Sequence, residues 1–356
     1  MQIVSGLGVF WRSREVLQIG LDSRVGVLVE GLSPQEQELV AFLTSPRTAA
    51  ELNPMAEARG IDTARLTDIL TMLHRAGVLE GLPLNSASED THTKAVIASS
   101  ASRRLPASAA LSNSLRPVRS SVPRADRGER HVSISHLNPL GTEIGIKLAE
   151  HGVGTVSFSD RRRVNAHDHP LLWPRWQGLP REQAMTTVLR QFSPDTLLQG
   201  DGEPDVAVYS GSRLVNPVAT QEYMDSGTPH LLAWTEEVDV CIGPLVEPQL
   251  SPCAGCLHES RLAADPAWSV LMPQAENTHP LIAAGETRDL AAAIAVRSIL
   301  GFLDGVGNSL RDAQWRVPPL PNFPRFVAIS SHPTCGCTSH QAMIRALEST
   351  TTGQAT

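Results

Sequence analysis

Four cysteines in the last third of the chain have the spacing of a metal site. Cys253 and Cys256 form a C-x-x-C pair, and Cys335 and Cys337 form a C-x-C pair. Two short pairs of thiolates supply the four soft ligands of a closed tetrahedral zinc site, and such sites stabilise structure instead of performing chemistry. Buried free thiols would not predict such close pairing, and a redox site normally needs only one C-x-x-C. We therefore expect structural zinc at these four residues, with Cys241 left over as a core residue.

The number of cysteines argues against a disulfide framework. Five cysteines, an odd number clustered late in the chain, do not fit the even count of a small secreted protein. His332 and His340 flank the second cysteine pair, and either could replace one cysteine as a metal ligand.

The composition is that of an ordinary globular chain of two or three domains. The chain has 356 residues, of which 41% are hydrophobic, and a formal net charge of −7. No apolar run reaches membrane-spanning length, and the N-terminus lacks the pattern of a signal peptide. We therefore expect a cytoplasmic protein with no membrane partner. The acidic balance gives no general attraction to nucleic acid.

Residues 131–160 have the pattern of a strand, a tight loop, a helix and a second strand. A βαβ unit followed by an acidic residue, here Asp160, is typical of nucleotide binding. Where the glycines of G-x-G-x-x-G would fall, the chain has His136, Asn138 and Gly141. Only the third glycine, which lets the helix pack on the strand, is kept. The sequence therefore predicts this fold without its phosphate cradle, and leaves Asn138, Gly141 and Asp160 as a degenerate nucleotide site.

Strands and helices alternate after this unit, which predicts an α/β fold of the Rossmann type. We expect strands at 204–209, 229–234 and 238–242, a helix at 181–191 and an apolar, core-facing helix at 287–303. The sheet should be mixed toward its far edge.

Residues 1–83 predict a winged-helix-like module. Two strands, at 16–21 and 25–30, precede three helices, and the first helix opens with a capping box and a proline. Such a module could bind DNA, accept an extended peptide along an open strand edge, or only pack on the rest of the chain. The third helix has no basic stripe, because two aspartates offset its basic residues. We therefore favour peptide docking, then an inert module, then DNA binding.

The boundaries of the domains follow from composition. Residues 84–129 are rich in Ser, Ala, Arg and Pro and have no sustained apolar period, so we expect a flexible linker there. The linker should lead to an α/β domain at 130–340, and residues 341–356 should form a disordered tail.

The N-terminal module resembles the leader-peptide recognition element of ribosomal-peptide natural-product pathways, as found in PqqD-like proteins. The resemblance is carried by IGLDSRVGVLVEGLSPQEQELVAFL and TDILTMLHRAGVLE, and it covers nearly all of the module. It implies that a precursor's leader peptide lies along the second strand and against the third helix. The apolar residues that would contact the peptide are Val25, Val27, Val29, Leu66, Ile69, Leu70 and Leu73.

The C-terminal part resembles the ThiF-related proteins of thiazole/oxazole-modified peptide pathways. The resemblance is carried by GTPHLLAWTEEVDVCIGPLVEPQLSPCAGCLHESRLAADPAW, followed by HPTCGC. Within it, Arg261, Asp265-Pro266 and Trp268 are distinctive. The wider group, which includes MoeB and the ubiquitin-activating enzymes, is implied to share a ThiF-type Rossmann domain that adenylates a C-terminal carboxylate with ATP.

Several positions depart from the pattern that this reaction needs. Arg162 stands where the family has the second acid of D-x-D, and Asp168 and Leu171 stand where it has Asn-x-x-Arg. No aspartate stands at residues 209–211, where the magnesium-associated acid would fall. Without these groups and without the glycine loop, nothing would cradle phosphate or offset the charge that develops during transfer.

The resemblance therefore implies a protein with a degenerate ATP site that is not catalytic alone. It would bind a precursor leader peptide and raise its local concentration at a YcaO-type cyclodehydratase, the enzyme that forms azolines in azole bacteriocin pathways. The alternative is an active ATP-dependent adenylyltransferase that acts on a peptide or protein C-terminal carboxylate. The sequence leaves open a homodimer, which many ThiF relatives form.

Overall fold

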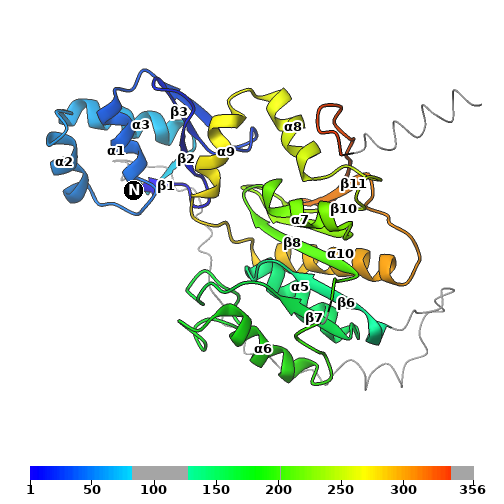
Figure 1. The fold of residues 1–356 in the computed structure, drawn as a ribbon. Helices are drawn as coiled ribbons and strands as arrows, with labels where there is room; N and C mark the ends of the chain where they lie inside the picture. The colour runs from blue at the N-terminus through cyan, green and yellow to red at the C-terminus, as the bar shows by residue number, and fades with distance from the viewer. Residues whose placement is uncertain (82–126, 201, 338–356) are drawn as a thin grey trace, which may run out of the picture. The chain divides into compact units, whose positions relative to one another are not determined.

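The computed structural model describes residues 1–81, 127–200 and 202–337 (Figure 1). The expected tail, His340 and all but the last three residues of the expected linker lie outside the described residues. Within the described ranges, no helix is both long enough and apolar enough to cross a membrane.

The described chain divides into two compact units. The smaller unit contains residues 1–9 and 13–81, and the larger unit contains residues 10–12 and 127–337. The smaller unit has three helices and short strands, whereas the larger unit is built on a sheet of seven strands.

The helices of the smaller unit pack beside a sheet in the order β2-β3-β4, in which β3 and β4 pair antiparallel. The two expected strands are present as β3 and β4, but each is shorter than predicted. The reason is a turn, in which Gly20 has a φ of 82° and the carbonyl of Asp22 accepts hydrogen bonds from the amides of Val25 and Gly26. β4 is an edge strand, because no other described strand pairs with its free side. The strands among residues 1–81 are β1 (Gln2–Ile3), β2 (Val9–Trp11), β3 (Val16–Ile19), β4 (Val27–Glu30) and β5 (Leu79–Glu80), of which β1 pairs with β5.

The three helices of the smaller unit are α1 (Pro34–Phe42), α2 (Ala49–Glu57) and α3 (Thr63–Arg75). The expected capping box starts α1: the Ser33 hydroxyl accepts from the amide of Glu36, whose carboxylate accepts from the amide of Ser33. The helices bury their apolar faces in one core with the inner residues of β3 and β4. The assignment of this unit to the winged-helix class stays a prediction.

The larger unit contains a mixed sheet in the order β12-β11-β10-β9-β8-β6-β7. The strands β7, β6, β8 and β9 are parallel, and β10, β11 and β12 continue the sheet antiparallel. The α/β fold and the change to antiparallel pairing toward one edge are therefore confirmed. The strands are β6 (His131–Ile134), β7 (Thr155–Phe158), β8 (Val206–Ser212), β9 (His230–Thr235), β10 (Val240–Val246), β11 (Ala313–Val317) and β12 (Arg325–Ala328).

Helices cover both faces of this sheet (Figure 1). On one face α5 packs against both α6 and α10, and their apolar residues share a core with inward residues of β6, such as Val132. On the other face, α8 contributes to a second core with Cys241 and Trp234. Cys241 is completely buried. The helices are α5 (Pro139–Glu150), α6 (Arg181–Phe192), α7 (Gln221–Ser226), α8 (Ala254–Ala264), α9 (Trp268–Glu276) and α10 (Gly285–Leu303), together with the 3-10 helices η1 (Arg127–Glu129) and η2 (Val218–Thr220).

The helices α8 and α9 and the strands β11 and β12 are not predicted by the sequence pattern. The apolar residues of these elements are few and irregularly spaced, so no single period indicates them. The long apolar helix expected near the end is α10, and it begins two residues earlier than expected.

Candidate functional site

A pocket of about 360 Å³ opens at the carboxyl ends of the parallel strands. The chain leaves β6 toward β7 on one side and returns on the other side to β8, so the pocket lies where the strand order reverses. Open α/β sheets bind their ligands at this position. The loops after β6, β7 and β8 line the pocket together with the segment between α9 and α10. The pocket therefore has the position of a ligand site in such a fold.

The first turn of α5 faces the pocket, but few of its backbone amides are free to bind a phosphate. Asn138 caps this helix, and its side-chain oxygen lies 2.8 Å from the amide nitrogen of Gly141. Pro139, at the first helical position, has no amide hydrogen. The amide of Leu137 donates to Asp160 at 2.8 Å. Anions bind at helix N-termini because free amides point at them, and here the side chain of Asn138 and the carboxylate of Asp160 already occupy two of the amides.

Gly141 fulfils the packing role that the sequence predicts. A Cβ atom at this position would lie 2.1 Å from the carbonyl oxygen of His136 and 3.1 Å from the side chain of Ser210. No other residue type fits without a shift of the backbone. The kept glycine therefore maintains the close approach of α5 to the loop after β6, which is a structural role.

Asp160, the acid after β7, is buried and saturated with donors. Its Oδ1 accepts from the backbone amide of Arg162 at 3.1 Å and from Nε of the same residue at 2.8 Å. Its Oδ2 accepts from Nη2 of Arg162 at 2.6 Å, Nη1 of Arg181 at 3.1 Å and the amide of Leu137 at 2.8 Å. A carboxylate offers about four lone-pair positions, so these five donors use its full capacity. Although burial opposes it, the charge-assisted bonds from Arg162, with those from Leu137 and Arg181, hold the pKa of Asp160 well below its usual range.

Arg181, which the sequence analysis did not single out, connects the two acids at the base of the pocket. Its guanidinium is almost fully buried and donates to Asp168 Oδ2 at 3.0 Å as well as to Asp160. Asp168 lines the pocket, but Leu171, the expected position of the phosphate-binding arginine, does not. A basic residue directly after Pro180, at the start of a helix in the β7–β8 connection, is the signal that could have found Arg181.

The charges around the pocket do not favour a triphosphate. Among the described arginines and acids, Arg162, Arg181, Asp168 and Glu276 line the pocket, and the two arginines pair with the buried Asp160 and with Asp168. Burial, followed by the charge of Arg162, lowers the pKa of His136, so this ring is neutral at neutral pH. Two guanidinium groups opposite three carboxylates leave no excess of positive charge for a polyanion.

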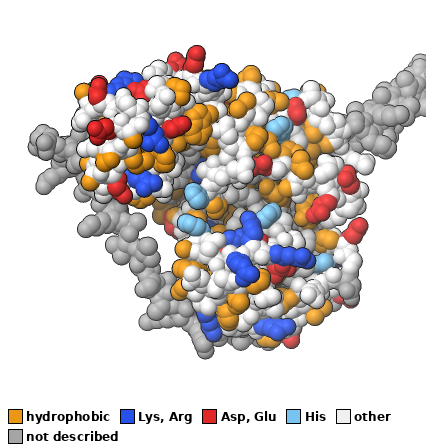
Figure 2. All heavy atoms as spheres, turned by 60° about the vertical axis from the view of Figure 1, so that its left-hand side comes forward, with side chains coloured by type: hydrophobic (Ala, Val, Ile, Leu, Met, Phe, Trp, Pro, Cys, Tyr) orange, Lys and Arg blue, Asp and Glu red, His pale blue; other side chains and the backbone are white. Residues whose placement is uncertain are grey.

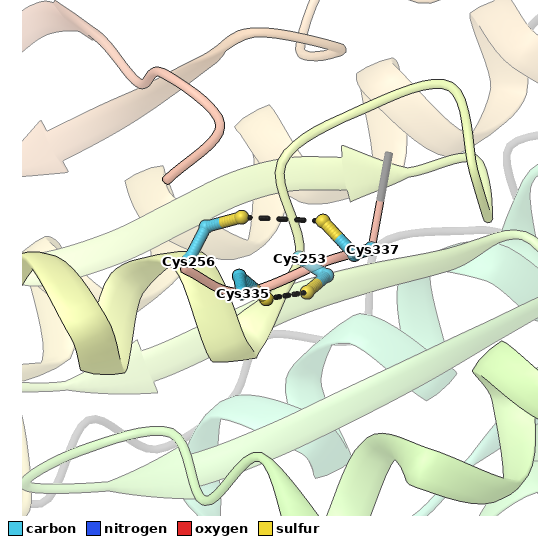
Figure 3. A group of neighbouring side chains, drawn as sticks. All are labelled: Cys253, Cys256, Cys335 and Cys337. Carbon is cyan, nitrogen blue, oxygen red and sulfur yellow. Dashed lines mark hydrogen bonds between the residues drawn. The ribbon is translucent and has the colours of Figure 1, made fainter. Parts of the chain in front are cut away.

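The four cysteines come together in space as the sequence predicts (Figure 3). Their sulfur atoms all lie within 4.8 Å of one another, with 3.5 Å between Cys253 and Cys335 and 3.3 Å between Cys256 and Cys337. These separations are too long for disulfides, and all four thiols are free. Four thiolates at the zinc–sulfur distance of about 2.3 Å would be about 3.8 Å apart in a tetrahedron. The cluster could therefore hold a metal ion.

The surroundings of the cluster suit thiolate ligands. Cys253 is the N-cap of α8 and Cys256 lies in its first turn, where the helix dipole favours negative charge. Burial, with the neighbouring Cys253, raises the pKa of Cys335 to about 12, so the four thiols do not all ionise without a cation. Gly255 is required by space, since a Cβ there would lie 2.7 Å from the sulfur of Cys335. His332 is exposed, and in the described chain it is not part of the cluster.

The expected peptide-contacting residues of the smaller unit are mostly in its core. Val25 is exposed and Val27 is half-buried, whereas the others have less than a tenth of their surface accessible. Leu28 on β4 and Met72 on α3 are the exposed apolar side chains of the two elements. Arg65 ties the start of α3 to the end of β4, because it donates to the carbonyl of Gly31 at 3.3 Å and to the Glu36 carboxylate. The buried residues expected at the peptide site are Val29, Leu66, Ile69, Leu70 and Leu73.

Comparison with known proteins identifies the fold. No family model and no curated protein sequence matches this chain. Among solved structures, Escherichia coli MccB with ATP is similar over 95% of this chain and 99% of its own, with a TM-score of 0.51 and 12% identity. MccB with AMPCPP and MccA is similar over 94% and 98% of the two chains, with a TM-score of 0.51 and 13% identity. A structure described as the microcin C7 biosynthetic enzyme MccB with N-formylated MccA covers 95% and 99%, with a TM-score of 0.50 and 13% identity.

These similarities extend over both units of the chain. With the mixed seven-stranded sheet, they are consistent with the ThiF-type fold that the sequence resembles. At such low identity the likeness concerns the fold alone, so substrate and activity depend on the side chains described above.

Proposed function

We propose that this chain binds a ribosomally made precursor peptide and presents it to a modifying enzyme, a YcaO-type cyclodehydratase, without activating the peptide itself. The observation that carries the proposal is the saturated carboxylate of Asp160 beside a capped α5. A site in which Asp160 and Asn138 already accept from the amides of Leu137 and Gly141, and which carries no excess positive charge, is poorly suited to stabilise a triphosphate or its transfer.

The smaller unit is the proposed site of peptide docking. β4 has a free edge among the described strands, and an extended peptide can add to such an edge through backbone hydrogen bonds. Val27 and Leu28 on β4 and Met72 on α3 offer apolar surface to the added strand. Figure 2 shows hydrophobic side chains exposed between charged ones on the molecular surface. Proteins of the same fold have been crystallised with the peptide MccA, which supports a peptide as the ligand.

A titration tests this docking directly. A fluorescently labelled leader peptide, taken from a precursor encoded beside this chain, should bind saturably in a fluorescence anisotropy measurement. The Val27→Asp variant should weaken binding by at least about tenfold, because an apolar contact rejects an unpaired charge. Val218→Lys is the matched control, since Val218 is a highly exposed apolar residue of the larger unit, and it should leave the affinity unchanged. If no encoded leader peptide binds to the wild-type chain, the docking proposal is wrong.

The partner enzyme has its own test. Mixed with the YcaO-type cyclodehydratase, the chain should elute as a larger complex in size-exclusion chromatography with light scattering. In activity assays, cyclodehydration at low peptide concentration should fall when the Val27→Asp variant replaces the wild-type chain, and a high peptide concentration should restore it, because docking acts through effective concentration. The same light-scattering measurement gives the mass of the chain alone and decides whether it is a homodimer.

An active adenylyltransferase is the second candidate. It is favoured by the position of the pocket and by the crystallisation of MccB, which has the same fold, with ATP. This candidate predicts ATP–pyrophosphate exchange that requires a free peptide C-terminal carboxylate and disappears in Asp160→Asn. Exchange above background in the wild-type chain alone would support this candidate and contradict the non-catalytic proposal.

A structural zinc ion completes the proposal. Four thiolates with near-tetrahedral spacing match the ligands that zinc prefers, and a closed set leaves no open position for a substrate. Its role would be to fix the start of α8 to the segment that carries Cys335 and Cys337.

A further inference from the structure

The position of Asp160 in the fold is that of a ribose-binding acid. It follows β7, the second strand of the βαβ unit, at the carboxyl edge of the parallel strands and beside the pocket. In such units an acid at this position accepts hydrogen bonds from the ribose hydroxyls of a nucleotide. A hydroxyl can donate only to a lone pair that no other donor uses.

Arg162 takes up the lone pairs that a ribose would need. Its guanidinium forms a bidentate pair with Asp160, with Nε at 2.8 Å from Oδ1 and Nη2 at 2.6 Å from Oδ2. The remaining donors, the amides of Leu137 and Arg162 and the buried Arg181, come from the frame of the fold. Arg162 differs from these because its side chain is 55% exposed and lines the pocket. It is therefore the contact that can be removed without dismantling the site.

We infer that Arg162 is a specificity-determining residue that closes the pocket to ribonucleosides by occupying the carboxylate of Asp160. The inference rests on the proposed degeneracy of the pocket and not on peptide docking. Bidentate arginine–carboxylate pairs are stronger than a hydroxyl–carboxylate bond, and the pair lies within one chain. A ribose must displace it to bind, whereas a ligand without a diol need not.

Removal of the Arg162 side chain should therefore create a ribose site. In Arg162→Ala, Oδ1 of Asp160 keeps only the backbone amide of residue 162, so one lone pair is free for a ribose hydroxyl. A hydrogen bond to a charged group is worth about tenfold or more in affinity. We expect Arg162→Ala to bind adenosine at least tenfold more tightly than 2′,3′-dideoxyadenosine in isothermal titration calorimetry. The wild-type chain should not distinguish the two.

Arg161→Ala is the matched control. The side chain of Arg161 is 96% exposed, and its nearest acid is Glu182 at 3.9 Å, so its loss removes the same charge and leaves Asp160 occupied. This variant should behave as the wild type. Arg162→Gln, which keeps the aliphatic stem, is a second variant for the case in which circular dichroism shows that Arg162→Ala does not fold.

Three results would overturn the inference. The first is a folded Arg162→Ala or Arg162→Gln chain without any preference for the diol. The second is a wild-type chain that already prefers adenosine to the dideoxy compound. The third is tight binding of adenosine 2′,5′-bisphosphate by the wild type and its loss in Arg162→Ala, because Arg162 would then receive a phosphate instead of excluding a ribose. Labelled leader peptide should bind to Arg162→Ala as to the wild type, so failure here is separate from failure of the docking proposal.

Discussion

At Gly141 the structure has no room for any side chain larger than the hydrogen of glycine. An added Cβ would lie 2.1 Å from the carbonyl oxygen of His136, which is backbone and cannot move away as a side chain could. Gly301, in the helix α10, has no atom within 4 Å of the equivalent position. The two glycines therefore respond oppositely to the same substitution.

We predict that Gly141→Ala lowers the free energy of unfolding by about 3 kcal/mol, the upper range for overpacking of a tight site. Gly301→Ala should instead raise it by about 0.5 to 1 kcal/mol, because alanine is the better helix former. Urea denaturation followed by circular dichroism measures both values. Equal effects of the two substitutions would show that the loop after β6 yields easily.

His230 should make the free energy of unfolding depend on pH through the titration of a single buried side chain. It is fully buried at the start of β9, where its Nδ1 donates to the carbonyl of Thr228 at 2.9 Å, and its Nε2 has no hydrogen-bond partner among the described residues. Burial lowers the pKa of this imidazole to about 4. Between pH 6.5 and about 4 the unfolded chain therefore binds a proton that the folded chain does not, so the free energy of unfolding falls as the pH decreases.

The expected size of this loss is about 3 kcal/mol between pH 7.5 and 4, from the difference between the two pKa values. His230→Asn keeps a donor near Nδ1 but has no group that titrates in this range, so its stability should depend less on pH by that amount. Urea denaturation at several pH values measures the difference between the two chains. Acid effects at the cysteine cluster and at the other buried groups are common to both and cancel. Parallel pH profiles would exclude a buried, neutral His230.

At the scale of secondary-structure elements, the cysteine cluster joins parts of the chain that are far apart in the sequence. One pair lies at the start of α8, and the other lies just after β12 (Figure 3). Packing covers the second pair only in part, since Cys335 and Cys337 are half-buried against the core that includes Cys253 and Cys256. A metal ion would therefore stabilise this connection more than packing does.

We predict one zinc ion per chain, measured by inductively coupled plasma mass spectrometry on protein purified without chelator. Cys256→Ala should lose the zinc, because three thiolates no longer close the tetrahedron. Cys241→Ala, which removes the cysteine outside the cluster, should keep it. Cobalt substitution should give the intense visible bands of tetrahedral thiolate coordination. A Cys256→Ala chain with a full complement of zinc would mean that the metal binds elsewhere.

At the scale of the whole molecule, the two units divide the proposed work between them. The smaller unit has a free strand edge for the proposed peptide. The larger unit contains the pocket beside Asp160, which Arg162 and Arg181 line. Val27→Asp should therefore change peptide affinity but not nucleoside selectivity, and Arg162→Ala nucleoside selectivity but not peptide affinity. The tests proposed above measure both readouts on the same two variants, and cross-effects would contradict this division.

The fold of this chain does not by itself determine its function. The similar solved structures share about an eighth of their residues with this chain over almost its whole length, which is enough to keep a core pattern. They do not carry a substrate over to it, because substrates are bound by particular side chains and the fold can keep its shape while these change.

The sequence by itself determined the βαβ unit, the packing glycine Gly141 and the four cysteines as one cluster. The residues of the βαβ unit and of each cysteine pair are neighbours along a strand, a helix turn or a short loop, so their local geometry follows from the backbone. The two distant cysteine pairs are linked by chemistry instead, because a closed tetrahedral zinc site needs four ligands. The tertiary structure alone decided that Arg162 and Arg181 fill the carboxylate of Asp160, since a long side chain on a loop can point in many directions. It also decided that Val29, Leu66 and Leu73 lie in the core of the smaller unit, because an apolar pattern shows which face is buried but not what covers it.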